Sequence, residues 1–120
     1  MLDKAEIPNL NRIKKDGAML KAYVGGEKGG YSETPTISAV GYNSLLTGTW
    51  VNKHNVYDND IKAPNYNYPT IFRLFRNQFP NKKMAVFSTW EDNRTKLIGE
   101  NLDATGKIKM DFAFDGLEKD

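Results

Sequence analysis

The sequence contains no cysteine, one histidine and no long apolar run. Without cysteine, disulfide-stabilised folds and cysteine-based zinc sites are excluded, and redox chemistry gives no information on the cellular compartment. The one histidine, His54, is too few for a histidine-rich zinc site. No apolar stretch approaches the roughly 20 residues that a membrane helix needs, so no membrane span is expected.

A strong excess of charge of one sign is also missing. The 120 residues include 17 basic and 15 acidic side chains, mixed along the chain, for a net charge of +2. The densest basic pairs, Lys14-Lys15 and Lys82-Lys83, are typical of a solvated surface. A nucleic-acid polymer is therefore not expected as a partner. The N-terminus lacks the apolar segment of a signal peptide, so localisation stays open, with the periplasm or secretion compatible with a longer parent protein.

The length and a hydrophobic content of 39% indicate one small globular domain. Apolar spacing and the Gly and Pro positions predict its elements. They are a helix opening at Pro8, a strand over 18–24, a glycine-rich loop over 25–36, a helix over 39–46, a polar segment over 49–68, a helix from Pro69, a strand over 83–89, a helical turn over 91–97 and an edge strand over 108–114. This alternation predicts an α/β fold. Because the order begins with a helix, we interpret residues 1–120 as a single incomplete α/β domain that lacks a preceding strand.

After the glycine-rich loop a hydroxyl residue, Ser38, stands directly before the helix over 39–46. A helix N-terminus exposes free N–H groups with a partial positive charge, which suits a phosphate. A serine there can cap the helix, or it can attack phosphorus if a cation stabilises its alkoxide. This motif alone favours the cap.

The surrounding segment TISAVGYNSLLTGTWVNKHNVYDND, residues 36–60, resembles a known nucleophile region. It is similar to that of the type I phosphodiesterase and nucleotide pyrophosphatase branch of the alkaline phosphatase superfamily. In that branch a Thr or Ser lies nine residues before a Thr-Gly pair, and a His-Gly element and an Asn follow. Counting from Thr47 identifies Ser38, His54 and Asn59 with these positions.

Flanking segments resemble the same branch in the same order. DKAEIPNLNRIKKDGA, residues 3–18, resembles the helix after its first strand, and YPTIFRLFR, residues 68–76, resembles its Pro-Thr-Ile-Phe helix. The resemblance covers Asp3 to Trp90.

Some positions depart from the family pattern. Asn55 stands where the family has Gly, and a bulged loop would exchange Ser38 for Thr36 as the nucleophile. Ser38 is followed by Ala39-Val40-Gly41-Tyr42 rather than by x-Pro-Ser-Arg, which disfavours a formylglycine sulfatase.

The resemblance implies a fold, a reaction and a site. The fold would be a partial three-layer α/β/α sandwich without its first strand and its C-terminal half. Ser38 would be the metal-coordinated nucleophile and Asn59 a donor to a phosphate oxygen. The parent would use two divalent metals, with zinc expected, on a small-molecule phosphate ester. In that family the metal ligands are an Asp just after the first strand and later Asp and His residues, which the resemblance does not match in this sequence. Asp3 is not taken as one of these ligands. The 120-residue chain alone is therefore expected to be inactive.

Two other classes of function stay open. In the first, the chain is an anion-binding module without catalysis. In the second, it is a structural remnant whose unpaired sheet edges allow self-association. His54 is interpreted first as a packing residue rather than an active-site neighbour. The aromatic residues of the polar segment either line a cleft or pack on the scaffold, and those of the helix from Pro69 are expected in the core. The two sets are Trp50, Tyr57, Tyr66 and Tyr68, and Phe72, Phe75 and Phe79.

Overall fold

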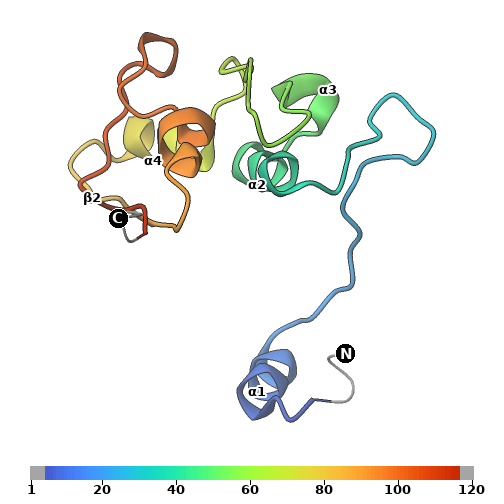
Figure 1. Ribbon diagram of the computed structural model, residues 1–120. Helices are drawn as coiled ribbons and strands as arrows, with labels where there is room; N and C mark the ends of the chain where they lie inside the picture. The colour runs from blue at the N-terminus through green and yellow to red at the C-terminus, as the bar shows by residue number, and fades with distance from the viewer. Residues whose placement is uncertain (1–4, 117–120) are drawn as a thin grey trace.

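The computed structural model describes residues 5–116 and contains helices together with a two-stranded parallel sheet (Figure 1). The helical elements and strands are α1 (Pro8–Asp16), α2 (Ser38–Thr47), α3 (Val51–His54), α4 (Ile71–Gln78), β1 (Ala85–Phe87), the π-helical η2 (Asn93–Ile98), the 3₁₀-helical η3 (Asp103–Thr105) and β2 (Phe112–Phe114). The mixed α/β class expected from the sequence is confirmed in this coarse sense.

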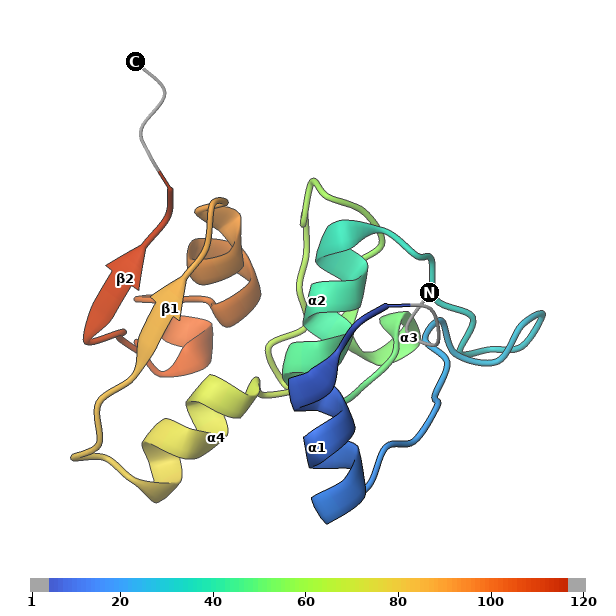
Figure 2. The same ribbon diagram turned by 90° about the horizontal axis from the view of Figure 1, so that it is seen from below.

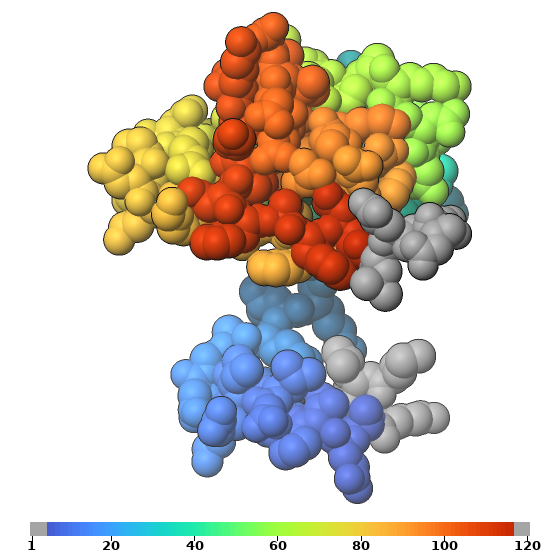
Figure 3. Space-filling model, turned by 60° about the vertical axis from the view of Figure 1, so that its left-hand side comes forward, coloured from blue at the N-terminus to red at the C-terminus, as the bar shows by residue number. Residues whose placement is uncertain are grey.

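The N-terminal helix α1 stands apart from the rest of the molecule. It begins with Pro8 in its first turn, as predicted, but none of its residues is buried. Figure 3 shows α1 joined to the larger body by a narrow neck of chain. The strand predicted over 18–24 is wrong, because this neck is assigned no strand and leaves Leu20 90% exposed. Alternating apolar residues form a strand only where a second strand supplies hydrogen bonds, and none is paired with this segment among the described residues.

Helix α2 matches the predicted helix over 39–46 closely. It follows Ile37, whose backbone is extended, and ends at Gly48, which has a φ of 65° and donates its N–H to the Ser44 carbonyl. Glycine adopts this left-handed conformation without the steric cost that a Cβ adds. The ends of α2 are therefore set by local sequence.

Helix α4 begins two residues after Pro69, at Ile71, with the Thr70 hydroxyl accepting from the Arg73 N–H at 3.4 Å. The expected core role of its aromatic stripe holds in part. Phe72 is half-buried and packs on buried residues, but Phe75 and Phe79 are 37% and 45% exposed. An amphipathic stripe is buried only along the length that another element faces, and here that length is short.

Strands β1 and β2 are parallel and in register, with Val86 opposite Ala113 (Figure 2). They are shorter forms of the strands predicted over 83–89 and 108–114. The Asp111 carboxylate lies where they start and accepts hydrogen bonds from Lys83, from the Met84 N–H and from Arg76, at 2.9, 2.9 and 2.7 Å. These bonds hold the pKa of Asp111 far below its ordinary value.

Two buried clusters form the core. The first surrounds the inner face of α2 and contains Ala39, Val40, Val51, Val56, Ile61 and Leu97. The second lies under the sheet and contains Met84, Ile98, Ile108 and Met110. Leu46 packs against both clusters, so the end of α2 connects the two halves of the body. Within residues 5–116 no helix is long and apolar enough to cross a membrane.

Candidate functional site

Ser38 is the first residue of α2 and its side chain is exposed to solvent. The helix has ten residues, and no side chain caps it from the Ile37 position. The first N–H groups of a helix lack intrahelical acceptors, so they remain available to other groups. Ser38 thus carries its hydroxyl at a positively polarised and accessible helix end.

Asn59 folds back onto this same helix end. Its Oδ1 accepts the Ala39 N–H at 3.0 Å, across 20 residues of sequence. Because Oδ1 is engaged, the amide is oriented and Nδ2 is left as its donor, with no protein acceptor found for it in the described part of the chain. The structure therefore brings Asn59 next to Ala39, the residue that follows Ser38.

The loop that carries Asn59 is fixed from beneath by two buried side chains. Val56 and Ile61 are 1% and 4% exposed and belong to the first core cluster. Ile61 has a φ of 52°, a conformation that is costly for a β-branched residue. Between them, Asp58 Oδ1 accepts the Asp60 N–H at 3.0 Å in a local turn. Core packing thus holds a strained backbone that positions Asn59.

His54 is fully buried beneath the site. Its Nδ1 accepts the Val56 N–H at 3.1 Å, and its Nε2 lies 3.0 Å from the Ser44 hydroxyl. Ser44 in turn donates to the Val40 carbonyl at 2.9 Å. This chain of bonds fits a neutral imidazole with its proton on Nε2. Burial lowers the pKa of His54 below its ordinary value of 6.5. The geometry agrees with the packing interpretation of this residue.

A cleft of about 500 Å³ opens beside Ser38. One wall is the exposed face of α2, and the other is the chain that leads into and out of the glycine-rich loop. The cleft is lined among others by Val24, Ile37, Ser38, Tyr42, Leu45 and Trp50. Its position places the Ser38 hydroxyl at the border of an apolar hollow.

The tyrosines and tryptophan of the polar segment divide between the two predicted roles. Trp50 lines the cleft. Tyr66 belongs to the scaffold, because its hydroxyl donates to the Lys96 carbonyl at 2.6 Å. Tyr57 is 54% exposed and Tyr68 is half-buried, and neither lines the cleft. The cleft interpretation therefore holds for Trp50 alone of the four.

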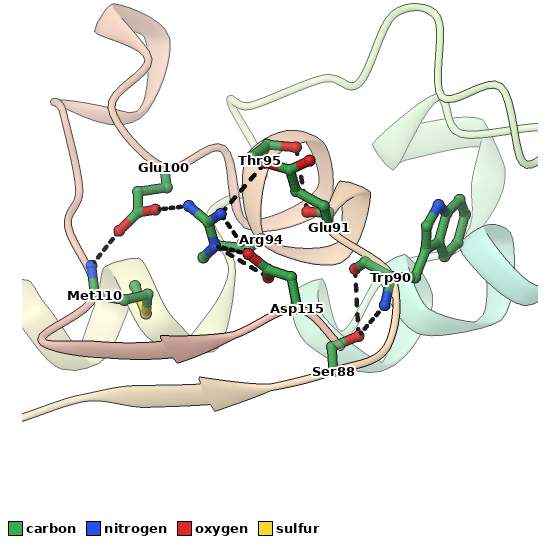
Figure 4. A network of polar contacts seen from close by, with 8 residues as sticks. All are labelled: Ser88, Trp90, Glu91, Arg94, Thr95, Glu100, Met110 and Asp115. Carbon is green, nitrogen blue, oxygen red and sulfur yellow. Dashed lines mark hydrogen bonds and ion pairs between the residues drawn. The ribbon is translucent and has the colours of Figure 1, made fainter. Parts of the chain in front are cut away.

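A polar network around Arg94 was not predicted (Figure 4). Arg94 of η2 donates from Nε to Asp115 at 3.0 and 3.1 Å and pairs with Glu100 and with Glu91. Glu100 also accepts the Met110 N–H at 2.7 Å. Hydrogen bonds from Arg94 lower the pKa of Asp115. The network joins the crossover between β1 and β2 to the end of β2, and its role is structural.

A two-metal centre needs several acidic or histidine ligands gathered in one place. Across residues 5–116, no group of three or more such side chains is placed to hold a metal ion. Asp3, which we did not take as a ligand, lies outside the described residues. The described residues alone do not fit the metal pair that the resemblance implies, so we derive no step through a metal.

Comparisons with protein-family models, with curated proteins and with solved structures found no match to this chain.

Proposed function

We propose that this chain carries the nucleophile segment of a metal-dependent hydrolase similar to phosphodiesterases and nucleotide pyrophosphatases. In this proposal the small α/β body is part of a three-layer sandwich, and two divalent metals, with zinc expected, are bound with ligands from elsewhere in the parent. The observation that supports it most is the bond from the Ala39 N–H to Asn59. This bond joins the start of α2 to the loop that carries Asn59. The resemblance assigns both segments to one site, whereas local sequence gives no reason for them to meet.

The chemistry follows from the groups at the helix end. Ser38 Oγ would form a bond to phosphorus, while the bond from phosphorus to the leaving alkoxide breaks. The serine loses its proton as it attacks, and the leaving alkoxide gains one. Negative charge grows on the nonbridging oxygens, where Asn59 Nδ2 is the nearby donor. Donors fixed before the reaction stabilise that charge without reorganisation.

The test replaces the two hydroxyl candidates separately in the full-length natural protein, assayed with Zn²⁺ and bis(4-nitrophenyl) phosphate. Ser38→Ala is expected to lower kcat by about a thousandfold or more, because the nucleophile is removed. Thr36→Val is the matched control, since Thr36 lies two residues away and is also exposed. It is expected to stay within a few-fold of the wild type.

Four results would contradict the proposal or change it. Wild-type turnover by Ser38→Ala excludes Ser38 as nucleophile. The reverse pattern, with Thr36→Val inactive, moves the role to Thr36. The 120-residue chain alone is expected to show no turnover, so EDTA-sensitive hydrolysis by it would contradict the division of the site that we propose. Phosphate binding without turnover by any form would favour a non-catalytic anion-binding module.

A further inference from the structure

Helix α2 forms one wall of the cleft beside Ser38, mostly through one stripe of its residues. Ser38, Gly41, Tyr42 and Leu45 all line the cleft and follow the i, i+3, i+4, i+7 spacing of one helix face. Ser38 stands at the N-terminal end of this stripe. At 1.5 Å per residue the stripe extends roughly 10 Å from the hydroxyl, which is the length of a medium-sized organic group.

The helix backbone itself forms part of the cleft floor at Gly41. A Cβ built at this residue would meet nothing within 4 Å, so space remains there. Val24, Ile37 and Trp50 also line the cleft. The volume of about 500 Å³ lies in the range of roughly 300–1,000 Å³ that is usual for small-molecule sites.

The absence of charged side chains from the lining indicates which ligands the cleft does not suit. None of its residues is a Lys, Arg, His, Asp or Glu. A second phosphate group or another polyanion would enter without a charged partner, which is costly in an apolar hollow. An alkyl or aryl group would bury apolar surface against Ile37, Leu45 and Trp50 instead.

We propose that the cleft along α2 binds the alcohol part of the substrate, and that this part is an apolar alkyl or aryl group. The inference rests on the proposed role of Ser38 as the group that meets phosphorus. A cleft of this kind favours phosphate esters of apolar alcohols over esters that carry further charged groups. The phosphoryl group would lie at the N-terminal end of α2, with the apolar group along Gly41, Tyr42 and Leu45.

The experiment measures binding of a series of alkylphosphonates, from methyl to hexyl, by quenching of Trp50 fluorescence. The chain has two tryptophans, and only Trp50 lines the cleft, so Trp90→Phe serves as the background in every variant. Phosphonates are not hydrolysed, so binding is read without turnover. We expect affinity to rise about fourfold for each methylene that the cleft buries.

Gly41→Leu fills the cleft and favours the helix, so it is expected to abolish the dependence of phosphonate affinity on chain length. Asn77→Leu is the control, because it adds the same side chain to an exposed position on α4. Leu45→Ser, at a position 82% exposed, should weaken the dependence without disturbing the fold.

Equal affinity for methyl- and hexylphosphonate overturns the inference, and so does the absence of any binding. A dependence on chain length that survives both Gly41→Leu and Leu45→Ser also overturns it, because the alkyl group then binds elsewhere. The proposed function fails separately, through retained turnover by Ser38→Ala. That substitution is expected to leave the chain-length dependence of phosphonate binding intact.

Discussion

At the scale of single residues, the surroundings of His54 disfavour its charged form. Its ring is fully buried, and the proton on Nε2 is matched by the Ser44 hydroxyl while Nδ1 receives the Val56 N–H. A second proton would have to sit on Nδ1 and would face another N–H donor. Burial and this contact both oppose the charged form, in accord with the lowered pKa.

A pH dependence of stability follows. Because the folded pKa of His54 lies below its ordinary 6.5, the unfolded chain binds the proton more readily. The contribution of His54 to the free energy of unfolding is therefore greatest above about pH 6.5. It falls as the pH decreases toward the pKa of His54 in the folded chain, by at most about 1.4 kcal/mol per pH unit. Urea unfolding between pH 7.5 and 5 measures this slope.

His54→Gln is the control for that slope. Glutamine does not titrate, so the variant is expected to be less stable at pH 7.5 but flat over the same range. A wild-type curve that is equally flat would show that His54 is protonated as readily in the folded as in the unfolded chain.

At the scale of elements, the glycine-rich loop is closed by backbone contact. The Thr34 N–H donates to the Gly25 carbonyl at 2.6 Å, and the Thr34 hydroxyl accepts the Val51 N–H at 3.2 Å. Gly26 lies inside this loop with a φ of 68°, and a Cβ there would sit 1.8 Å from the Ser32 carbonyl oxygen. Only glycine fits this close approach.

Gly26→Ala should therefore lower the free energy of unfolding more than Gly29→Ala does. Gly29 has a similar φ of 74°, but a Cβ there meets nothing within 4 Å, so its cost is the conformational one of about 1–2 kcal/mol. Urea unfolding of both variants separates the two contributions. Equal losses would show that the Gly26 backbone moves away from Ser32 without cost.

The π-helical element η2 offers a second comparison, between a charge in a network and a charge in an exposed pair. Arg94→Met leaves Glu100, whose side chain is 7% exposed, without its cation and should cost roughly 3 kcal/mol. Lys96→Met breaks a pair with Asp92 whose lysine is 45% exposed, and should stay within about 0.5 kcal/mol. Urea unfolding midpoints decide this, and equal losses would contradict a structural role of the Arg94 network.

Elements with local signals were predicted well from the sequence. The ends of α2 follow from Gly48 and from apolar spacing, and both strands of the sheet lie within the segments that predicted them. The strand over 18–24 was wrong because its existence depends on a distant partner. The Arg94 network joins residues 6 and 21 positions apart, and no spacing rule brings Arg94 to Asp115.

The candidate site shows the same division. The position of Ser38 at a helix start was readable from the glycine-rich loop and the apolar helix that follows. The bond from the Ala39 N–H to Asn59 was not readable from local sequence, because a contact across 20 residues leaves no local pattern. The cleft was not predicted from local patterns, since its lining runs from Val24 to Trp50 and depends on the closure of the glycine-rich loop beside α2.

At the scale of the whole molecule, apolar side chains remain exposed over much of the surface. They lie on α1, on the neck that follows it, on α4 and on both strands, and include Ile13, Leu20, Leu74, Phe87 and Phe112. The self-association anticipated from the sequence stays a prediction, with β1 and β2 as the strands that would take part.

The separation of α1 from the body has a thermodynamic consequence. A helix of nine residues with no buried side chain gains little from packing against the other described residues, and it is shorter than the roughly 12–15 residues below which isolated helices are marginal in water. The helix–coil equilibrium of α1 is then independent of the cooperative unfolding of the body. Free-energy changes made in one part add to those made in the other.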